Sequence, residues 1–364
     1  MSVKLAPLSD MSRPSASAIP IQPPSAAFRG KLAGMAALVF LSASLLLARE
    51  SRVRPPTLRQ FMEKRGYTVV KVDRTPEQHL MVNGRIDGKR ARFVVDTGFT
   101  FNAVETNWAK RLPRVSSQEE AALTPPGNPP GSFQFARLNH FELDGRPYPA
   151  EVAMVTRWWQ RGLFLPWMPV FRMGGALDCD AVLGVPFLQH HRAVIDYGQP
   201  PGLFVRGTAP SSEATREIEE SFRLSGFAPV EPIYLPPGKW VVSARVNNRQ
   251  VGLLVDTGGY RTVLDQRLAA ELGVKMRPGV DLMHGVEGRQ STMTDARIQR
   301  LELGESVFTN LTVSVADLAP WNLSPTQKSL LLPRGILGSD LLTETRAILD
   351  CETPRIWFLK SAVR

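Results

Sequence analysis

The sequence predicts an all-β fold made of two homologous lobes with short helices, preceded by one N-terminal transmembrane helix. Three observations predict it: a long internal repeat, strand and turn patterns in both copies of the repeat, and an uncharged apolar segment near the N-terminus. The length of 364 residues fits two domains at a typical size of about 150 residues each. Hydrophobic residues make up 43% and charged residues 21%, so most of the chain can bury a core.

The repeat has a period near 160 residues. FVVDTGFTFNAV and LLVDTGGYRTVL place Asp96 and Asp256 160 residues apart. The downstream segments AVLGVPFLQHHRAVIDY and GILGSDLLTETRAILDC are offset by 154 residues, because the second copy is six residues shorter. We therefore expect an N-terminal lobe at 57–206, a linker at 207–216 and a C-terminal lobe at 217–364, packed about a pseudo-two-fold axis.

Each copy also has the pattern of a β-hairpin that runs into its DTG. The turns are predicted at Asp87-Gly88 and at Asn247-Asn248, which are residue types that adopt the left-handed backbone of tight hairpins. Short helices are predicted before each hairpin and after each DTG, at 58–65, 216–224, 105–112 and 265–272.

The N-terminus predicts attachment to a membrane. Residues 1–30 are rich in Pro, Ser and Ala and are expected to be a disordered basic leader. Residues 31–48 contain seventeen consecutive uncharged residues, just enough for a single membrane-spanning helix; a cleaved signal peptide is the second choice. A linker at 49–56 follows. Both flanks of the helix are basic, so orientation is weakly determined, and we expect an extracytoplasmic body.

The charge distribution and the histidine and cysteine residues exclude several classes of function. The first 75 residues contribute +8 of the net charge of +10, so the near-neutral remainder is not expected to bind nucleic acid. The five histidines form no metal-binding motif. The adjacent His190 and His191 would point to opposite sides of a strand and are interpreted as surface or capping residues. We therefore predict no metal site and no cofactor. Cys179 and Cys351 could form one disulfide or remain two buried thiols.

The duplicated DTG indicates acid–base chemistry. A pseudo-two-fold axis between the lobes would bring Asp96 and Asp256 face to face. Two carboxylates at about 3 Å cannot both ionise, so they share a proton. The ionised carboxylate can act as general base on a water molecule, while the protonated one polarises a carbonyl and the pair later protonates the leaving amine. This chemistry requires neither a metal nor a covalent intermediate.

These residues resemble the aspartic peptidases of retropepsin and pepsin type. The two DTG motifs, Val182-Leu183-Gly184 and Ile336-Leu337-Gly338 carry the resemblance, which covers about residues 57–364. It implies two retropepsin-like lobes fused in tandem, with Asp96 and Asp256 as the catalytic pair. It further implies that Thr97 and Thr257 lock the two loops by crossed hydrogen bonds and that Gly98 and Gly258 set the carboxylate geometry. The segments ending at Gly184 and Gly338 would support the loops from beneath.

Two positions depart from that family. Ser, Thr or Ala commonly follows the DTG, and a Ser or Thr there hydrogen-bonds the outer carboxylate oxygen; here Phe99 and Gly259 occupy these positions. This departure suggests the alternative function, a catalytically inactive module of the same fold that binds peptides or proteins.

Two further segments are candidates for substrate contact. His284, Gly285 and Gly288 lie where the second lobe would carry a flap over the dyad, and 124–131 is the stiffer first-lobe counterpart. The aromatic segment 156–171 is interpreted first as core or lobe contact, and otherwise as an apolar subsite or a membrane-interface patch. It contains Trp158, Trp159, Phe164, Trp167 and Phe171.

The sequence thus predicts a membrane-anchored aspartic endopeptidase. Its partner would be a peptide or protein substrate. The duplication allows a monomer to act as an intramolecular pseudo-dimer.

Overall fold

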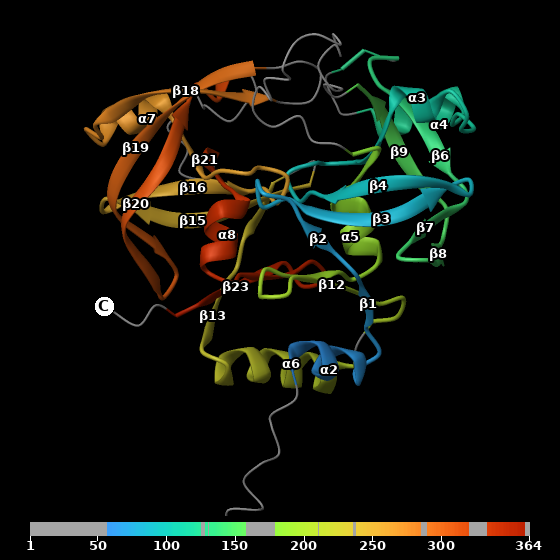
Figure 1. Cartoon of the computed structure of the whole chain (residues 1–364), viewed down its shortest axis with the longest axis horizontal. Helices are drawn as coiled ribbons and strands as arrows, with labels where there is room; N and C mark the ends of the chain where they lie inside the picture. Colours follow the sequence, from blue (N-terminus) through green and yellow to red (C-terminus); the bar gives the residue numbers. More distant parts are fainter. Residues whose placement is uncertain are drawn as a thin grey trace, which may run out of the picture. The chain divides into compact units, whose positions relative to one another are not determined.

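The computed structural model describes residues 57–124, 128–129, 131–157, 179–209, 211–235, 238–284, 290–319 and 333–360. These residues form three β-sheets with short helices, so the mostly-β prediction is confirmed (Figure 1). Among them, no helix has both the length and the apolar composition needed to cross a membrane. The predicted leader, membrane segment and linker of residues 1–56 lie outside the described residues.

The first sheet belongs to the first copy of the repeat. Its strands follow the order β6-β9-β5-β10-β4-β3-β7-β8, with β2 paired to β3. Their bounds are β2 Asp73–Arg74, β3 Leu80–Ile86, β4 Lys89–Val95, β5 Asn102–Glu105, β6 Gln134–Leu138, β7 Phe141–Leu143, β8 Arg146–Tyr148, β9 Glu151–Thr156 and β10 Ala181–Leu183.

The second sheet belongs to the second copy, in the order β14-β15-β16-β21-β17-β20-β19-β18. Its strands are β14 Ile233–Leu235, β15 Lys239–Val246, β16 Arg249–Val255, β17 Val263–Asp265, β18 Met276–His284, β19 Gln290–Leu303, β20 Ser306–Ala316 and β21 Pro333–Leu337. In both sheets the strand before the DTG lies in the interior and pairs in parallel with the strand before the apolar-Gly segment: β4 with β10, and β16 with β21.

The third sheet joins the two copies. Its order is β1-β12-β11-β22-β23-β13, with β1 Thr68–Val70, β11 Val194–Asp196, β12 Gly202–Val205, β13 Phe227–Val230, β22 Ile348–Asp350 and β23 Arg355–Leu359. The central pair is antiparallel and aligns Ile195 with Leu349, which are equivalent positions of the repeat. The order is therefore symmetric about this pair, as expected for two copies related by a pseudo-two-fold axis.

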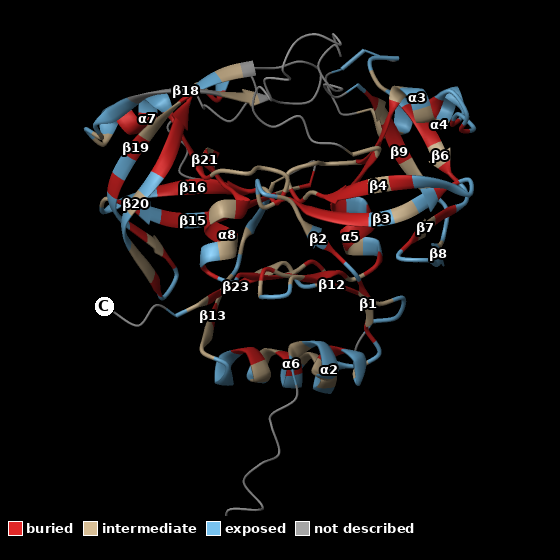
Figure 2. Ribbon diagram, in the orientation of Figure 1, coloured by how far each residue is buried: buried red, intermediate tan, exposed pale blue. Residues whose placement is uncertain are grey.

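Both predicted hairpins form, with the predicted turn residues. Asp87 and Gly88 have φ of 46° and 73°, and Asn247 and Asn248 have φ of 45° and 68°. Two consecutive positive φ values match the twist of a two-residue hairpin. Burial increases along β4 and β16 toward their C-terminal ends, so each hairpin delivers its DTG from the interior of a sheet (Figure 2).

The described helices α2, α3, α6 and α7 lie at the four predicted positions, whereas α4, α5 and α8 were not predicted. Their bounds are α2 Leu58–Glu63, α3 Thr106–Ala109, α4 Ser117–Leu123, α5 Val185–His190, α6 Ser212–Leu224, α7 Gln266–Glu271 and α8 Ser339–Glu344. The helix α6 begins inside the predicted linker 207–216, because Ser211 caps it through the Ala214 N–H. Cys179 is half-buried and Cys351 is buried, and they are not joined by a disulfide.

Candidate active site

Asp96 and Asp256 each follow directly after an interior strand of their sheet. The Asp96 N–H donates to the Leu183 carbonyl at 3.0 Å, and the Asp256 N–H donates to the Leu337 carbonyl at 3.1 Å. The parallel pairing of β4 with β10 and of β16 with β21 thus continues into the first residue of each DTG. These backbone hydrogen bonds position both aspartates independently of their side-chain contacts.

The structure brings the two carboxyl groups together, and each is hydrogen-bonded to the other. Glycine is required beside them: a Cβ on Gly98 would lie 2.5 Å from Asp256 Cγ, and one on Gly258 would lie 2.3 Å from Asp96 Oδ2. Each glycine N–H also donates to the carboxylate of its own loop, at 2.7 Å for Gly98 and 2.9 Å for Gly258.

Thr97 and Thr257 are buried and link the two loops reciprocally. The Thr97 N–H donates to Thr257 Oγ1 at 3.0 Å, and the Thr257 N–H donates to Thr97 Oγ1 at 3.1 Å. Each hydroxyl in turn donates to the carbonyl before the opposite aspartate, Val255 at 2.9 Å and Val95 at 2.8 Å. These four bonds hold the two loops in one relative position.

Burial and mutual charge perturb both carboxyl groups. Burial raises the pKa of Asp96 well above its usual range, and the charge of Asp256 raises it further. Burial also raises the pKa of Asp256, although hydrogen bonds from Asp96 and from the Gly259 and Gly258 N–H groups oppose the increase. The pair therefore retains a proton at a pH where isolated aspartates are ionised.

Gly184 and Gly338 lie where the chain crosses behind the loops. A Cβ on Gly184 would lie 1.9 Å from the Phe101 carbonyl oxygen, and one on Gly338 would lie 2.3 Å from the Arg261 carbonyl carbon. The next residues donate to the loops: Val185 N–H to the Phe99 carbonyl at 3.1 Å and Ser339 N–H to the Gly259 carbonyl at 2.7 Å. Both positions therefore require glycine, because the neighbouring backbone leaves no room for a Cβ atom.

The two unusual residues after the DTG motifs are accommodated differently. The Phe99 side chain packs on an apolar cluster that includes Met81 and Val94, and its backbone N–H donates to Asp96. The Gly259 N–H donates to Asp256 Oδ1 at 2.8 Å. Backbone donors therefore reach both carboxylates, and neither position supplies a side-chain donor.

Part of the predicted substrate-contacting surface lies outside the described residues. The predicted flap is the hairpin β18–β19, paired as far as His284 with Gln290. Its tip at 285–289, with Gly285 and Gly288, is not among the described residues, and the same holds for the aromatic residues at 158–171. In the first copy the corresponding segment contains α4 in front of 124–131.

Three residues near the dyad were not predicted to contribute. The Tyr197 hydroxyl and Ser339 Oγ lie 2.9 Å apart, and Ser339 Oγ donates to the Thr257 carbonyl at 2.9 Å. His79 is buried against the Gly258 backbone, close enough to Asp256 to sense its charge, and burial lowers its pKa. Each of these residues contacts a residue of the other copy of the repeat. The only feature of the sequence that could have pointed to any of them is the position of Ser339 directly after Gly338.

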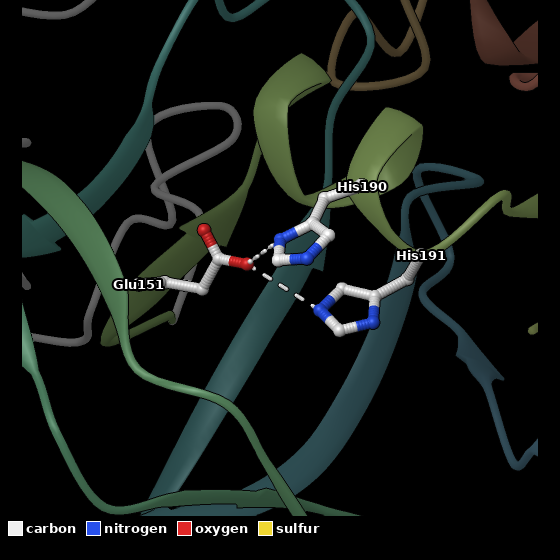
Figure 3. A group of neighbouring side chains, drawn as sticks. All are labelled: Glu151, His190 and His191. Atoms are coloured by element: carbon white, nitrogen blue, oxygen red, sulfur yellow. Dashed lines mark hydrogen bonds and ion pairs between the residues drawn. The ribbon is translucent and has the colours of Figure 1, made fainter. Parts of the chain in front are cut away.

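A second group of side chains also differs from the sequence interpretation. Glu151, His190 and His191 place their ligand atoms within 4.8 Å of one another, an arrangement that could hold a metal ion (Figure 3). The two histidines were expected to point to opposite sides of a strand. Instead, His190 is the last residue of α5 and His191 its C-cap, so both rings face the same carboxylate.

One protein family and several solved structures are similar to parts of this chain. Residues 242–341 match the family described as aspartyl protease. A retropepsin-like aspartic protease from Rickettsia conorii is 18% identical over 36% of this chain and 92% of its own, with a TM-score of 0.28. Basic 7S globulin from soybean is 14% identical over 81% of this chain and 95% of its own, with a TM-score of 0.42. The aspartic proteinase from Irpex lacteus is 13% identical over 82% of this chain and 98% of its own, with a TM-score of 0.41.

Comparison with curated proteins gives no match. The family match contains the second DTG, at Asp256, and the second apolar-Gly segment, at Gly338. Residues 242–341 thus match the aspartyl protease family, which agrees with the resemblance stated from the sequence.

Proposed function

We propose that the chain is an aspartic endopeptidase that hydrolyses peptide bonds with the Asp96/Asp256 dyad. The observation that carries the proposal is the mutual hydrogen bond of two carboxyl groups that come from equivalent loops of one chain. Both residues come from the same chain, so the proposal is that a monomer acts as an intramolecular pseudo-dimer.

The proposed mechanism requires one proton on the pair. The ionised carboxylate accepts a proton from a water molecule, and the resulting hydroxide attacks the peptide carbonyl carbon. The protonated carboxyl group hydrogen-bonds the carbonyl oxygen as negative charge develops there. The pair then protonates the leaving nitrogen, which breaks the C–N bond. The backbone N–H groups of Gly98, Gly258 and Gly259 hold the carboxylates in place throughout.

The test is hydrolysis of a peptide library by residues 57–364, which form one compact unit. We expect the wild type to cleave, and Asp96→Asn and Asp256→Asn each to abolish cleavage, because either change leaves only one carboxyl group. Asp87→Asn is the matched control: it makes the same chemical change in an exposed turn and should retain full activity. Cleavage that survives in either dyad variant would refute the mechanism.

One observation favours a second candidate function, a non-catalytic module that binds peptides. Neither Phe99 nor Gly259 offers a side-chain hydrogen-bond donor to the outer oxygen of its carboxylate. The same library distinguishes the two candidates. Peptide binding by the wild type without cleavage at any pH from acid to neutral supports the binding module.

The proposal includes attachment to a membrane through residues 31–48, with the body on the extracytoplasmic side. The uncharged apolar run supports attachment. The orientation rests on the ability of a large following domain to translocate, although the basic downstream flank by itself favours the cytoplasmic side. Alkaline extraction of membranes tests it. Release of the full-length chain into the soluble fraction would contradict attachment, and protease accessibility in sealed vesicles reports the orientation.

A further inference from the structure

The group formed by Glu151, His190 and His191 lies apart from the dyad and is not used by the proposed mechanism. His190 Nδ1 lies 2.9 Å and His191 Nε2 lies 3.3 Å from the same oxygen, Glu151 Oε1 (Figure 3). His191 is 6% exposed, and its Nε2 is buried without a hydrogen-bond partner. A buried ring nitrogen directed at a carboxylate without forming a hydrogen bond calls for another ligand.

We propose that these three side chains bind one divalent first-row transition metal ion, for which Zn²⁺ is the probe. Two imidazoles and one carboxylate are ligands that Zn²⁺ accepts, and the nitrogen donors disfavour Mg²⁺ and Ca²⁺. Bonds of about 2.0–2.2 Å in a tetrahedral site place neighbouring ligand atoms about 3.3–3.6 Å apart. The two nitrogen–oxygen separations of 2.9 and 3.3 Å are close to this range. All the ligand atoms lie within 4.8 Å of one another, and the exposed His190 ring can shift toward a shared ion.

The surroundings hold the carboxylate and the buried imidazole in this orientation. Asn102 Nδ2 donates to Glu151 Oε2 at 3.1 Å, which leaves Oε1 directed at the two imidazoles. Asn102 Oδ1 is itself fixed by the N–H groups of Gly184 and Phe187, at 3.1 and 3.2 Å. The His191 ring packs on Phe187, with ring centroids 4.4 Å apart. Partners of this kind orient metal ligands and increase their affinity.

The charge balance and the open side of the group also fit a metal ion. Metal ligation uses a carboxylate and neutral imidazoles, so the three ligands would together carry a charge of −1 toward a divalent cation. His190 has 60% of its side chain exposed, so a fourth ligand can come from solvent on that side. The ion would connect β9 to the C-terminal end of α5, the helix that starts directly after Gly184. The equivalent positions 154 residues later are Glu344 and Thr345, so the site belongs to the first copy alone.

The experiment is Zn²⁺ titration of the full-length chain after removal of metal by a chelator, in competition with a chromophoric Zn²⁺ indicator. We expect one equivalent to bind, and His190→Ala and Glu151→Gln each to weaken affinity at least about tenfold. His140→Ala is the matched control, since it removes an exposed histidine elsewhere, and it should bind as the wild type does. Co²⁺ in place of Zn²⁺ should give the visible absorption of a four-coordinate site, lost in His190→Ala.

Three results would overturn the proposal. They are no stoichiometric binding by the wild type, unchanged affinity in both ligand variants, or an equal loss in His140→Ala. The first would leave the group as a hydrogen-bonded carboxylate–histidine contact. Circular dichroism checks that each variant is folded; if Glu151→Gln is not, the exposed His190→Ala decides alone. None of these readouts depends on peptide hydrolysis.

Discussion

The reciprocal threonine bonds make a quantitative prediction about stability. Thr257→Val keeps the shape of the side chain but removes the hydroxyl that accepts from the Thr97 N–H and donates to the Val95 carbonyl. Both of these backbone groups are at buried residues, and the substituted side chain leaves them without a partner. An unsatisfied buried polar group costs about 1–3 kcal/mol. Allowing for some relaxation, we expect the free energy of unfolding to fall by about 2–4 kcal/mol.

The assay is urea unfolding of residues 57–364, followed by circular dichroism and tryptophan fluorescence. Thr257→Ser is the matched control, because it keeps the hydroxyl and removes only a methyl group. We expect it to lose no more than about 1 kcal/mol. Thr97→Val should cost as much as Thr257→Val, because Thr97 Oγ1 makes the equivalent two bonds.

A Thr257→Val variant within about 0.5 kcal/mol of the wild type would refute the reasoning, since surface changes have effects of that size. The same result in Thr97→Val would show that the loops are held by other contacts. The double variant with Thr97→Val and Thr257→Val measures the interaction free energy between the two threonines. Because the four bonds are distinct but share one rigid loop pair, we expect a non-zero interaction energy in the double-mutant cycle.

Three further predictions concern the dyad and its surroundings. The folded-state pKa of Asp96 lies above its ordinary value of 3.8, so the native state loses stability as pH rises from about 4 toward that pKa. Asp96→Asn removes this loss. At pH 7 the variant should therefore unfold at a higher urea concentration than the wild type, and this difference should shrink toward pH 3. Gly98→Ala places a Cβ against Asp256, so cleavage should fall about 100-fold or more while circular dichroism stays unchanged. Burial raises the pKa of Asp196 to about 6, so Asp196→Asn should flatten the decline in thermal stability between pH about 4 and 6, and an unchanged decline would contradict this assignment.

The fold was predictable because its main signals are local or repeated. The turns at Asp87-Gly88 and Asn247-Asn248 need left-handed backbone, which restricts the residue types and makes them visible in one sequence. The equivalence of Asp96 and Asp256 was visible because both copies keep Val-Asp-Thr-Gly at the end of an apolar strand, followed by an apolar-apolar-Gly segment at a similar spacing. The six-stranded sheet was not predicted strand by strand, since its pairing depends on segments far apart in the chain, such as Ile195 with Leu349.

The same reasoning explains which site residues were missed. Tyr197 and Ser339 meet through one hydrogen bond across 142 positions, and apart from the position of Ser339 after Gly338 no local pattern marks them. His190 is exposed and His191 caps a helix, as interpreted from the sequence, but their shared orientation was missed because an adjacent pair was assumed to lie on a strand. In the structure a helix ends at His190, and Arg192 then takes φ of 46°, so the chain turns and both rings stay on one side.

The contacts between the two copies also explain how two carboxyl groups can be held so close together. Their proximity is electrostatically unfavourable, and it persists only if the surrounding structure fixes both loops. Three independent groups of bonds do so: the β11–β22 pairing, the crossed threonine bonds, and the Tyr197–Ser339 bond that continues to the Thr257 carbonyl. All three cross between the copies, so separating the carboxylates requires breaking contacts on several sides at once. The shared proton is then the least costly way to relieve the repulsion, and that proton is what the proposed chemistry uses.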